Sequence, residues 1–351
     1  MLKKRLLLTF ITVFAILLLA FFGYRHWESR DSFARRADLL SLMPSDASAV
    51  GFLDLQQLRA SPFLLQVLSW APQAAPDSDY AQFVQATGFD YERDLDRIAL
   101  AFNRQSQTPW VLAVAEGRFD RKKIEAYAGR FGSLKTADGK TLFAVPMHGS
   151  DRKAYFSFLQ DDRVAWANDS SCFFQRPPGG SPQEWHEHLS RVAGTPIFAV
   201  LQQDSVPASA LELAPGGFRS PQLATLLSQL QWITVSGKPE GDVLRVVIDG
   251  ESLTETTTHQ LKELLSGLVV LAEVGLNDAK TGKQLDPELR QGYLELLQSA
   301  DIQQLDRGTS KSVRVIFEVT PKLLQAPRNA LPPVADPIKP ERQIKKQATQ
   351  R

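Results

Sequence analysis

The chain has 351 residues, of which 43% are hydrophobic and 23% are charged, and its net charge at neutral pH is +1. Residues 1–27 and 326–351 each carry +4, which leaves −7 on residues 28–325. Because an acidic body matches a phosphate backbone poorly, we expect no nucleic-acid partner. A single cysteine, Cys172, excludes an intrachain disulfide or a cysteine zinc site, and the adjoining Phe173 and Phe174 indicate that it is a packed core residue.

Residues 6–22, LLLTFITVFAILLLAFF, form an uncharged run after Lys3, Lys4 and Arg5. At about 1.5 Å per residue, this run extended to residue 24 approaches the ~30 Å hydrocarbon core of a bilayer. A cleaved signal peptide shares these features, but no A-x-A-like cleavage site follows the run. We therefore predict that residues 1–27 are a basic cytoplasmic stub and a transmembrane signal anchor. This places the chain in the inner (plasma) membrane as a single-pass protein, with the C-terminal body periplasmic or extracellular.

The first part of the body alternates short strands and helices after a polar, helix-prone connector at residues 28–43. Ser61 and Pro62 suit the start of a helix, and Asp120 and Gly132 suit the first turn and the end of another. The patterns predict strands at 48–55, 97–103, 109–117, 140–147, 153–160 and 163–169, and helices at 61–70, 79–87 and 119–132.

The second part repeats this order. Ser220 and Pro221 again suit a helix start, Trp232 ends that helix as Trp70 ends the first, and Asp249-Gly250 stands where Glu116-Gly117 stands in the first part. The patterns predict strands at 195–203, 232–250 (strand, turn, strand) and 312–320, and helices at 181–192, 220–232, 254–272 and 286–300.

These elements predict an α+β fold with a largely antiparallel sheet whose helices cover one face. The shared order of strand, helix, strand, strand, helix and strand favours an internal duplication into modules at 44–180 and 181–325. A chance alignment of alternating strands and helices is the alternative. Residues 326–351 contain five prolines and six basic residues, which predicts a disordered tail that either contacts anionic lipid or cell-wall polymer or has no partner.

Three stretches of this sequence, LMPSDASAVGFLDL, TGFDYERDLDRIALAF and VAEGRFDRKKIEAYA, together with the basic and apolar start, resemble a family of uncharacterised bacterial single-pass, membrane-anchored envelope proteins. The resemblance is concentrated in residues 43–130. It implies the anchor and the fold, and it implies no activity, cofactor or site residue.

Two short motifs contain residue types that occur in catalytic or metal sites. His186, Glu187 and His188 are possible metal ligands, but they lie in a predicted helix, where positions i and i+2 point about 200° apart, so a solvated helix face is the better interpretation. Residues 150–153, SDRK, fit the S-x-x-K pattern of penicillin-recognising enzymes, but the partner motifs S-D-N and K-T-G are absent, which favours a hairpin turn.

The acidic run GFDYERDLDR, residues 88–97, brings together Asp90, Glu92, Asp94 and Asp96. A calcium loop of the EF-hand type requires glycine at its sixth position and glutamate at its twelfth, where this chain has Leu95 and Ala101. We therefore expect Asp90 to cap a short turn, and Arg93 and Arg97 to pair with the carboxylates of the run.

No nucleotide-binding, zinc-protease or nucleophile-elbow motif occurs in the sequence. The sequence therefore favours a non-enzymatic, membrane-tethered envelope protein of binding or scaffold type, without a cofactor, metal or catalytic residue. Its partners would be the bilayer, through residues 6–24, and an envelope protein or an apolar ligand. Two alternatives are a carrier of an apolar ligand in a sheet groove and an envelope hydrolase with a dispersed site.

Overall fold

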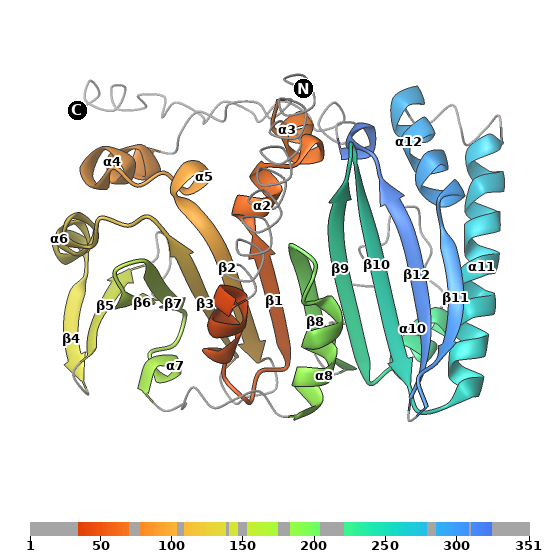
Figure 1. The fold of residues 1–351 in the computed structure, drawn as a ribbon, viewed down its shortest axis with the longest axis horizontal. Helices are drawn as coiled ribbons and strands as arrows, with labels where there is room; N and C mark the ends of the chain where they lie inside the picture. The colour runs from red at the N-terminus through yellow and green to blue at the C-terminus, as the bar shows by residue number, and fades with distance from the viewer. Residues whose placement is uncertain are drawn as a thin grey trace, which may run out of the picture.

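A computed structural model describes residues 34–69, 78–103, 109–137, 140–146, 153–174, 183–203, 221–278, 286–308 and 310–324. They form an α+β fold around one antiparallel sheet of twelve strands, in the order β11-β12-β10-β9-β8-β1-β2-β3-β7-β6-β5-β4 (Figure 1). The strands are β1 (Ala49–Asp54), β2 (Leu95–Asn103), β3 (Trp110–Gly117), β4 (Ser133–Ala137), β5 (Lys140–Pro146), β6 (Lys153–Gln160), β7 (Arg163–Ala167), β8 (Ile197–Gln202), β9 (Trp232–Glu240), β10 (Val243–Ser252), β11 (Asp301–Asp306) and β12 (Lys311–Val319).

The helices begin with a segment at residues 34–41, inside the predicted connector. The others are α2 (Leu55–Arg59), α3 (Pro62–Ser69), α4 (Ser78–Thr87), α5 (Tyr91–Asp94), α6 (Arg121–Phe131), α7 (Ser171–Phe174), α8 (Gln183–Val192), α10 (Pro221–Leu227), α11 (Glu255–Asn277) and α12 (Pro287–Gln298). Side chains cap several of them: Asp120 accepts a hydrogen bond from the Lys123 amide, and Asp286 accepts from two amides of α12.

The sheet confirms the predicted strands and adds two that the sequence did not predict. These are β4 and β11, the two edge strands of the sheet. The predicted helix at 220–232 is wrong in its second half, because α10 ends at Leu227 and Trp232 begins β9. Helix α11 continues to Asn277, five residues beyond its predicted end.

The prediction that helices cover only one face of the sheet is also wrong. On the first face, Leu39 and Met43 near helix 34–41 and residues of α7 and α8 pack in one core with Val50, Phe52 and Val200. Along β8, Val200 alternates with Leu201, whose neighbour Ile233 packs with α10 and α11 in a second core. The second core therefore lies on the opposite face of the sheet.

Strands β1 and β8 join the two halves of the chain into one sheet. They are antiparallel neighbours, and Phe52 lies opposite Phe198 with the ring centroids 5.4 Å apart. The predicted boundary between residues 180 and 181 lies outside the described residues, as do the predicted anchor and tail. Within the described residues, no helix is both long and apolar enough to cross a membrane.

Gly117, at the end of β3, lies against the chain where β2 begins. A Cβ atom there would lie 2.3 Å from the Asp94 carbonyl oxygen, which belongs to the backbone and cannot rotate away. We expect Gly117→Ala to lower the free energy of unfolding by about 1–3 kcal/mol through overpacking. Urea denaturation measures this change.

Gly129→Ala is the matched control, because a Cβ at Gly129 would meet no atom within 4 Å. This position lies in α6, where alanine is favoured over glycine by about 0.5–1 kcal/mol. Equal stability of the two variants would contradict the close contact at Gly117.

Candidate functional site

The most developed polar arrangement in the described residues is a row of buried charges across four neighbouring strands. The strand registers place Asp54 opposite Arg97, Arg97 opposite Glu116, and Glu116 opposite Arg163. Acidic and basic side chains thus alternate from β1 through β2 and β3 to β7, and all four residues are buried. We call this set the charged row.

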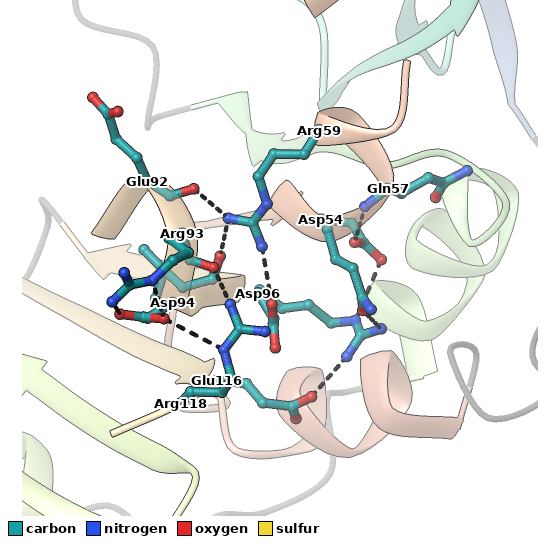
Figure 2. A network of polar contacts seen from close by, with 12 residues as sticks. Asp54, Gln57, Arg59, Glu92, Arg93, Asp94, Asp96, Glu116 and Arg118 are labelled. Atoms are coloured by element: carbon teal, nitrogen blue, oxygen red, sulfur yellow. Dashed lines mark hydrogen bonds and ion pairs between the residues drawn. The ribbon is translucent and has the colours of Figure 1, made fainter. Parts of the chain in front are cut away.

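Short contacts connect the members of the charged row, of which Figure 2 labels Asp54 and Glu116. Arg97 Nη1 donates to Glu116 Oε1 at 2.7 Å, and Arg97 Nε donates to Asp54 Oδ2 at 3.3 Å. Arg163 Nε donates to Glu116 Oε2 at 3.3 Å. Asp54 also caps α2 by accepting from the Gln57 amide at 2.9 Å. Each buried charge therefore faces a charge of opposite sign.

Helix 34–41 covers the charged row with side chains of its own. Arg163 Nη1 donates to Asp38 Oδ2 at 2.5 Å, and the Arg36 guanidinium lies 4.9 Å from the centre of the Phe52 ring and 4.0 Å from Asp54 Oδ2. Burial lowers the pKa of Arg36, and the nearby Asp54 carboxylate partly offsets that effect. The helix is thereby attached to the sheet by charge as well as by apolar packing.

The acidic run lies beside the charged row and behaves largely as the sequence predicts. Asp90 caps α5 by accepting from the Glu92 amide at 3.0 Å. Arg93 donates two hydrogen bonds to Asp94, at 3.0 and 2.8 Å. The prediction for Arg97 is wrong, since Arg97 lies on the buried face of β2 and pairs with Asp54 and Glu116 instead of the run.

Arg59 at the end of α2 connects that helix to the acidic run (Figure 2). Its Nη1 donates to the carbonyl oxygens of Glu92 and Leu95 at 2.8 and 2.7 Å, and its Nη2 donates to Asp96 Oδ1 at 2.9 Å. Arg118 contacts Asp94 and the Arg93 carbonyl oxygen from the other side. The run thus holds the start of β2 in place: Arg93 within it and Arg118 outside it pair with Asp94, and Arg59 pairs with Asp96.

A second charged cluster lies on β10 and β12. Arg314 forms a bidentate pair with Asp249, with both hydrogen bonds at 2.9 Å. Glu251 accepts from Arg191 and from Ser310, and His188 Nδ1 lies 3.2 Å from its Oε1. Burial alone would raise the pKa of Glu251, but His188, Arg191 and Ser310 together lower it.

The sequence motif at 186–188 has a different role from the one predicted. His186 is exposed, whereas His188 is buried, with its ring stacked on Trp232 at a centroid distance of 4.2 Å. The interpretation of a solvated helix face is therefore wrong for His188, although the divergence of the two histidines is confirmed. A search of the described residues finds no group of three or more potential metal ligands.

The remaining candidate residues contribute little to a site. Ser150 lies outside the described residues, and Lys153 is the exposed first residue of β6. Cys172 is buried in the first core, which confirms the prediction of a packed residue. The five buried carboxylates of the described residues, Asp54, Asp94, Glu116, Asp249 and Glu251, all pair with basic side chains. This arrangement neutralises charge and fixes strands, and it favours a structural role over proton transfer.

No protein-family model matches the chain, and no curated protein matches it either. Among solved structures, crystal form III of TP0453 aligns with a TM-score of 0.45 and 10% identity, over 83% of this chain and 98% of that chain. Crystal form I of TP0453 aligns with a TM-score of 0.43 and 9% identity, over 83% of this chain and 96% of that chain. A likeness at this level carries no argument about function.

Replacing the central arginine of the charged row tests how far the fold depends on that row. Arg97→Met keeps the side-chain length but leaves Glu116 and Asp54 buried without their strongest partner. We expect the free energy of unfolding to fall by about 3–5 kcal/mol, the usual effect of breaking a buried ion pair from one side. Urea denaturation at neutral pH measures it.

Arg245→Met is the control for that variant, since Arg245 also lies on a strand but pairs with Glu240 at the surface, at 3.9 Å. We expect Arg245→Met to lower the free energy of unfolding by no more than about 1 kcal/mol. If Arg97→Met lowered the free energy of unfolding as little as Arg245→Met does, the fold would not depend on the charged row.

The pairing of Asp94 predicts a dependence of stability on pH. Hydrogen bonds from Arg93 hold the pKa of Asp94 well below its ordinary value. A lowered pKa in the folded state stabilises the fold above the unfolded pKa of about 4, and this contribution is lost as the pH falls through the folded-state pKa. Asp94→Asn is therefore expected to be less stable than the wild type near neutral pH, and the difference is expected to shrink in strong acid.

Unfolding free energies of both proteins at several pH values measure that difference. Asp161→Asn is the control, because the Asp161 side chain is exposed and its nearest basic partner, Arg121, lies 3.7 Å away. We expect Asp161→Asn to change the free energy of unfolding little at any of these pH values. A difference for Asp94→Asn that does not change with pH would contradict the assigned pairing.

Proposed function

We propose that this chain is a membrane-tethered envelope protein whose acidic body lies outside the cytoplasm and binds a partner or ligand without catalysing a reaction. The observation that carries the proposal is the uncharged run at residues 6–22 behind three basic residues. The resemblance of residues 43–130 to single-pass envelope proteins supports it. Pairing of the buried carboxylates with arginine or histidine supports the non-enzymatic part.

We further propose that the body arose by duplication. The sheet order supports this: from the central pair outward, β1-β2-β3-β7-β6 on one side corresponds to β8-β9-β10-β12-β11 on the other. Glu116 lies opposite Arg163 as Asp249 lies opposite Arg314. In both halves, the residue after the acid is a glycine in close contact: a Cβ at Gly117 would lie 2.3 Å from the Asp94 carbonyl oxygen, and a Cβ at Gly250 would lie 2.8 Å from a methyl group of Leu230.

Helices on the first face also correspond between the two halves. Helix 34–41 precedes β1, and α8 precedes β8. Each supplies basic side chains to buried acids of its own half: Arg36 lies near Asp54, and Arg191 and His188 contact Glu251. This correspondence extends the proposed repeat by one helix at its start.

The anchor is tested by locating the full chain and both of its ends in cells. We expect the protein to stay in the membrane after alkaline carbonate washing and to keep its initial residues, as shown by N-terminal sequencing. A C-terminal alkaline phosphatase fusion is expected to be active. The double variant Leu17→Arg with Leu18→Arg is the control, since charges at the centre of a span oppose insertion by about 2.5–3.5 kcal/mol each.

Release of the wild-type chain by the wash would contradict the anchor. An inactive phosphatase fusion together with a fluorescent protein fusion that is bright would place the body in the cytoplasm. Cleavage after the apolar run would favour the signal-peptide alternative.

A further inference from the structure

Five neighbouring strands in the middle of the sheet, β8, β1, β2, β3 and β7, place the charged row and the apolar side chains of the first core on one face, and a second set of apolar side chains on the other. The charged row lies on the first face, beneath helix 34–41. On the other face, Leu53 lies opposite both Ile98 and Ile197, and Leu100 and Trp166 lie opposite Ala113. We call this second side of the five strands the open face.

The larger side chains of the open face are accessible. Leu100 is 42% exposed and Val111 is 38% exposed, and Leu53, Ile98, Trp166 and Ile197 are half-buried. On this side of the sheet, α10 packs against Ile233 of β9, next to β8, and other described helices pack farther out at the two flanks. Phe119, just before α6, contacts Phe158 of β6, while α11 packs against β10, β12 and β11.

The open face departs from the usual distribution of side chains on a sheet. An antiparallel sheet with one covered face normally turns its apolar side chains to the core and its polar side chains to water. Here the covered face follows that rule, apart from the charged row, but the other face is apolar as well although it is accessible. The largest accessible apolar patch of a monomer typically covers about 300–600 Å² and is often an interaction site for a protein, a membrane or an apolar ligand.

The size and chemistry of the open face favour a lipid over a protein. Five strands spaced at about 4.8 Å, each contributing five residues at about 3.3 Å, cover roughly 24 by 17 Å, or about 400 Å². A stable protein interface buries about 800 Å² on each partner and has a polar rim. The paired rows of the open face carry no charged side chain, and Asp96 at the irregular start of β2 is already paired with Arg59. The rows therefore offer no polar anchor to a protein and no counter-charge to an ionic ligand.

We propose that the open face binds the acyl chains of a membrane lipid. The inference rests on the proposed tether, which keeps the body next to a bilayer and makes lipid the most concentrated apolar partner. It also gives the binding function of the body a chemical class, since a continuous apolar surface selects for hydrocarbon and against charged groups.

The test is photo-crosslinking of the full chain in intact membranes. A photo-crosslinking phenylalanine derivative replaces Leu100 or Val111, and adducts are identified by mass spectrometry. The matched control carries it in place of Leu65, which is 58% exposed on α3 and lies outside the open face. We expect acyl-chain adducts several-fold more often at positions 100 and 111 than at position 65. Leu100→Asp is expected to reduce the adducts at position 111 at unchanged thermal stability.

Adducts to a second copy of the chain or to another protein at positions 100 and 111 would overturn the proposal. Equal lipid labelling at position 65 would overturn it too, because it would reflect only closeness to the membrane. The share of the protein in the carbonate-washed membrane is measured in the same cells and reports the tether separately. A chain that stays in the membrane but gives no preferential adduct would refute lipid binding while leaving the tether intact.

Discussion

The fold depends on the alternating charges that Asp54, Arg97, Glu116 and Arg163 place across β1, β2, β3 and β7. Taking such groups out of water costs several kcal/mol per ion, and their mutual attraction repays this only when every partner is in place. The row therefore sets the register more than it adds net stability. A slip of one residue would turn Arg97 to the other face and leave two carboxylates buried without it. Helix 34–41 completes the row, so its position is tied to the same register.

The two halves of the sheet use the same device to different degrees. In the second half, Arg314 lies opposite Asp249, but the neighbour of Asp249 on β9 is Thr234, at the place that Arg97 takes in the first half. Without a basic residue at that position on β9, Asp249 pairs only with Arg314 and Arg307 among the described residues, and no row of charges crosses four strands there. The basic side chains of α8 neutralise the remaining acid, Glu251, from above the sheet. In the first half, a strand residue, Arg97 of β2, thus supplies the basic partner of the buried acids, whereas in the second half helix α8 supplies basic partners.

Sequence reasoning identified the inner strands because their alternation of apolar and polar residues is set by burial on the sheet. It missed β4 and β11, SLKTA and DIQQLD, because edge strands are short and polar and their pattern resembles a loop. The partners of Arg97 were out of reach, since Asp54 and Glu116 lie 43 and 19 residues away and only the strand pairing brings them together. The burial of His188 did leave a sign: the apolar residues Trp185 and Val192 lie three and four residues from it, on the same face of the helix.

The open face follows from the way the helices are distributed. Under the proposed duplication, α6 and α11 are equivalent connections between the third and fourth strands of each half, and both lie on the second side of the sheet. Each packs toward the outer strands of its own half, α6 against β5 and α11 against β12 and β11. The helices that precede β1 and β8 pack on the first side. Joining two such halves through β1 and β8 therefore covers the centre of the first side and leaves the centre of the second side accessible. The accessibility of this surface is a consequence of the architecture, and its apolar character comes from the residues that the strands place there, such as Leu100 and Val111.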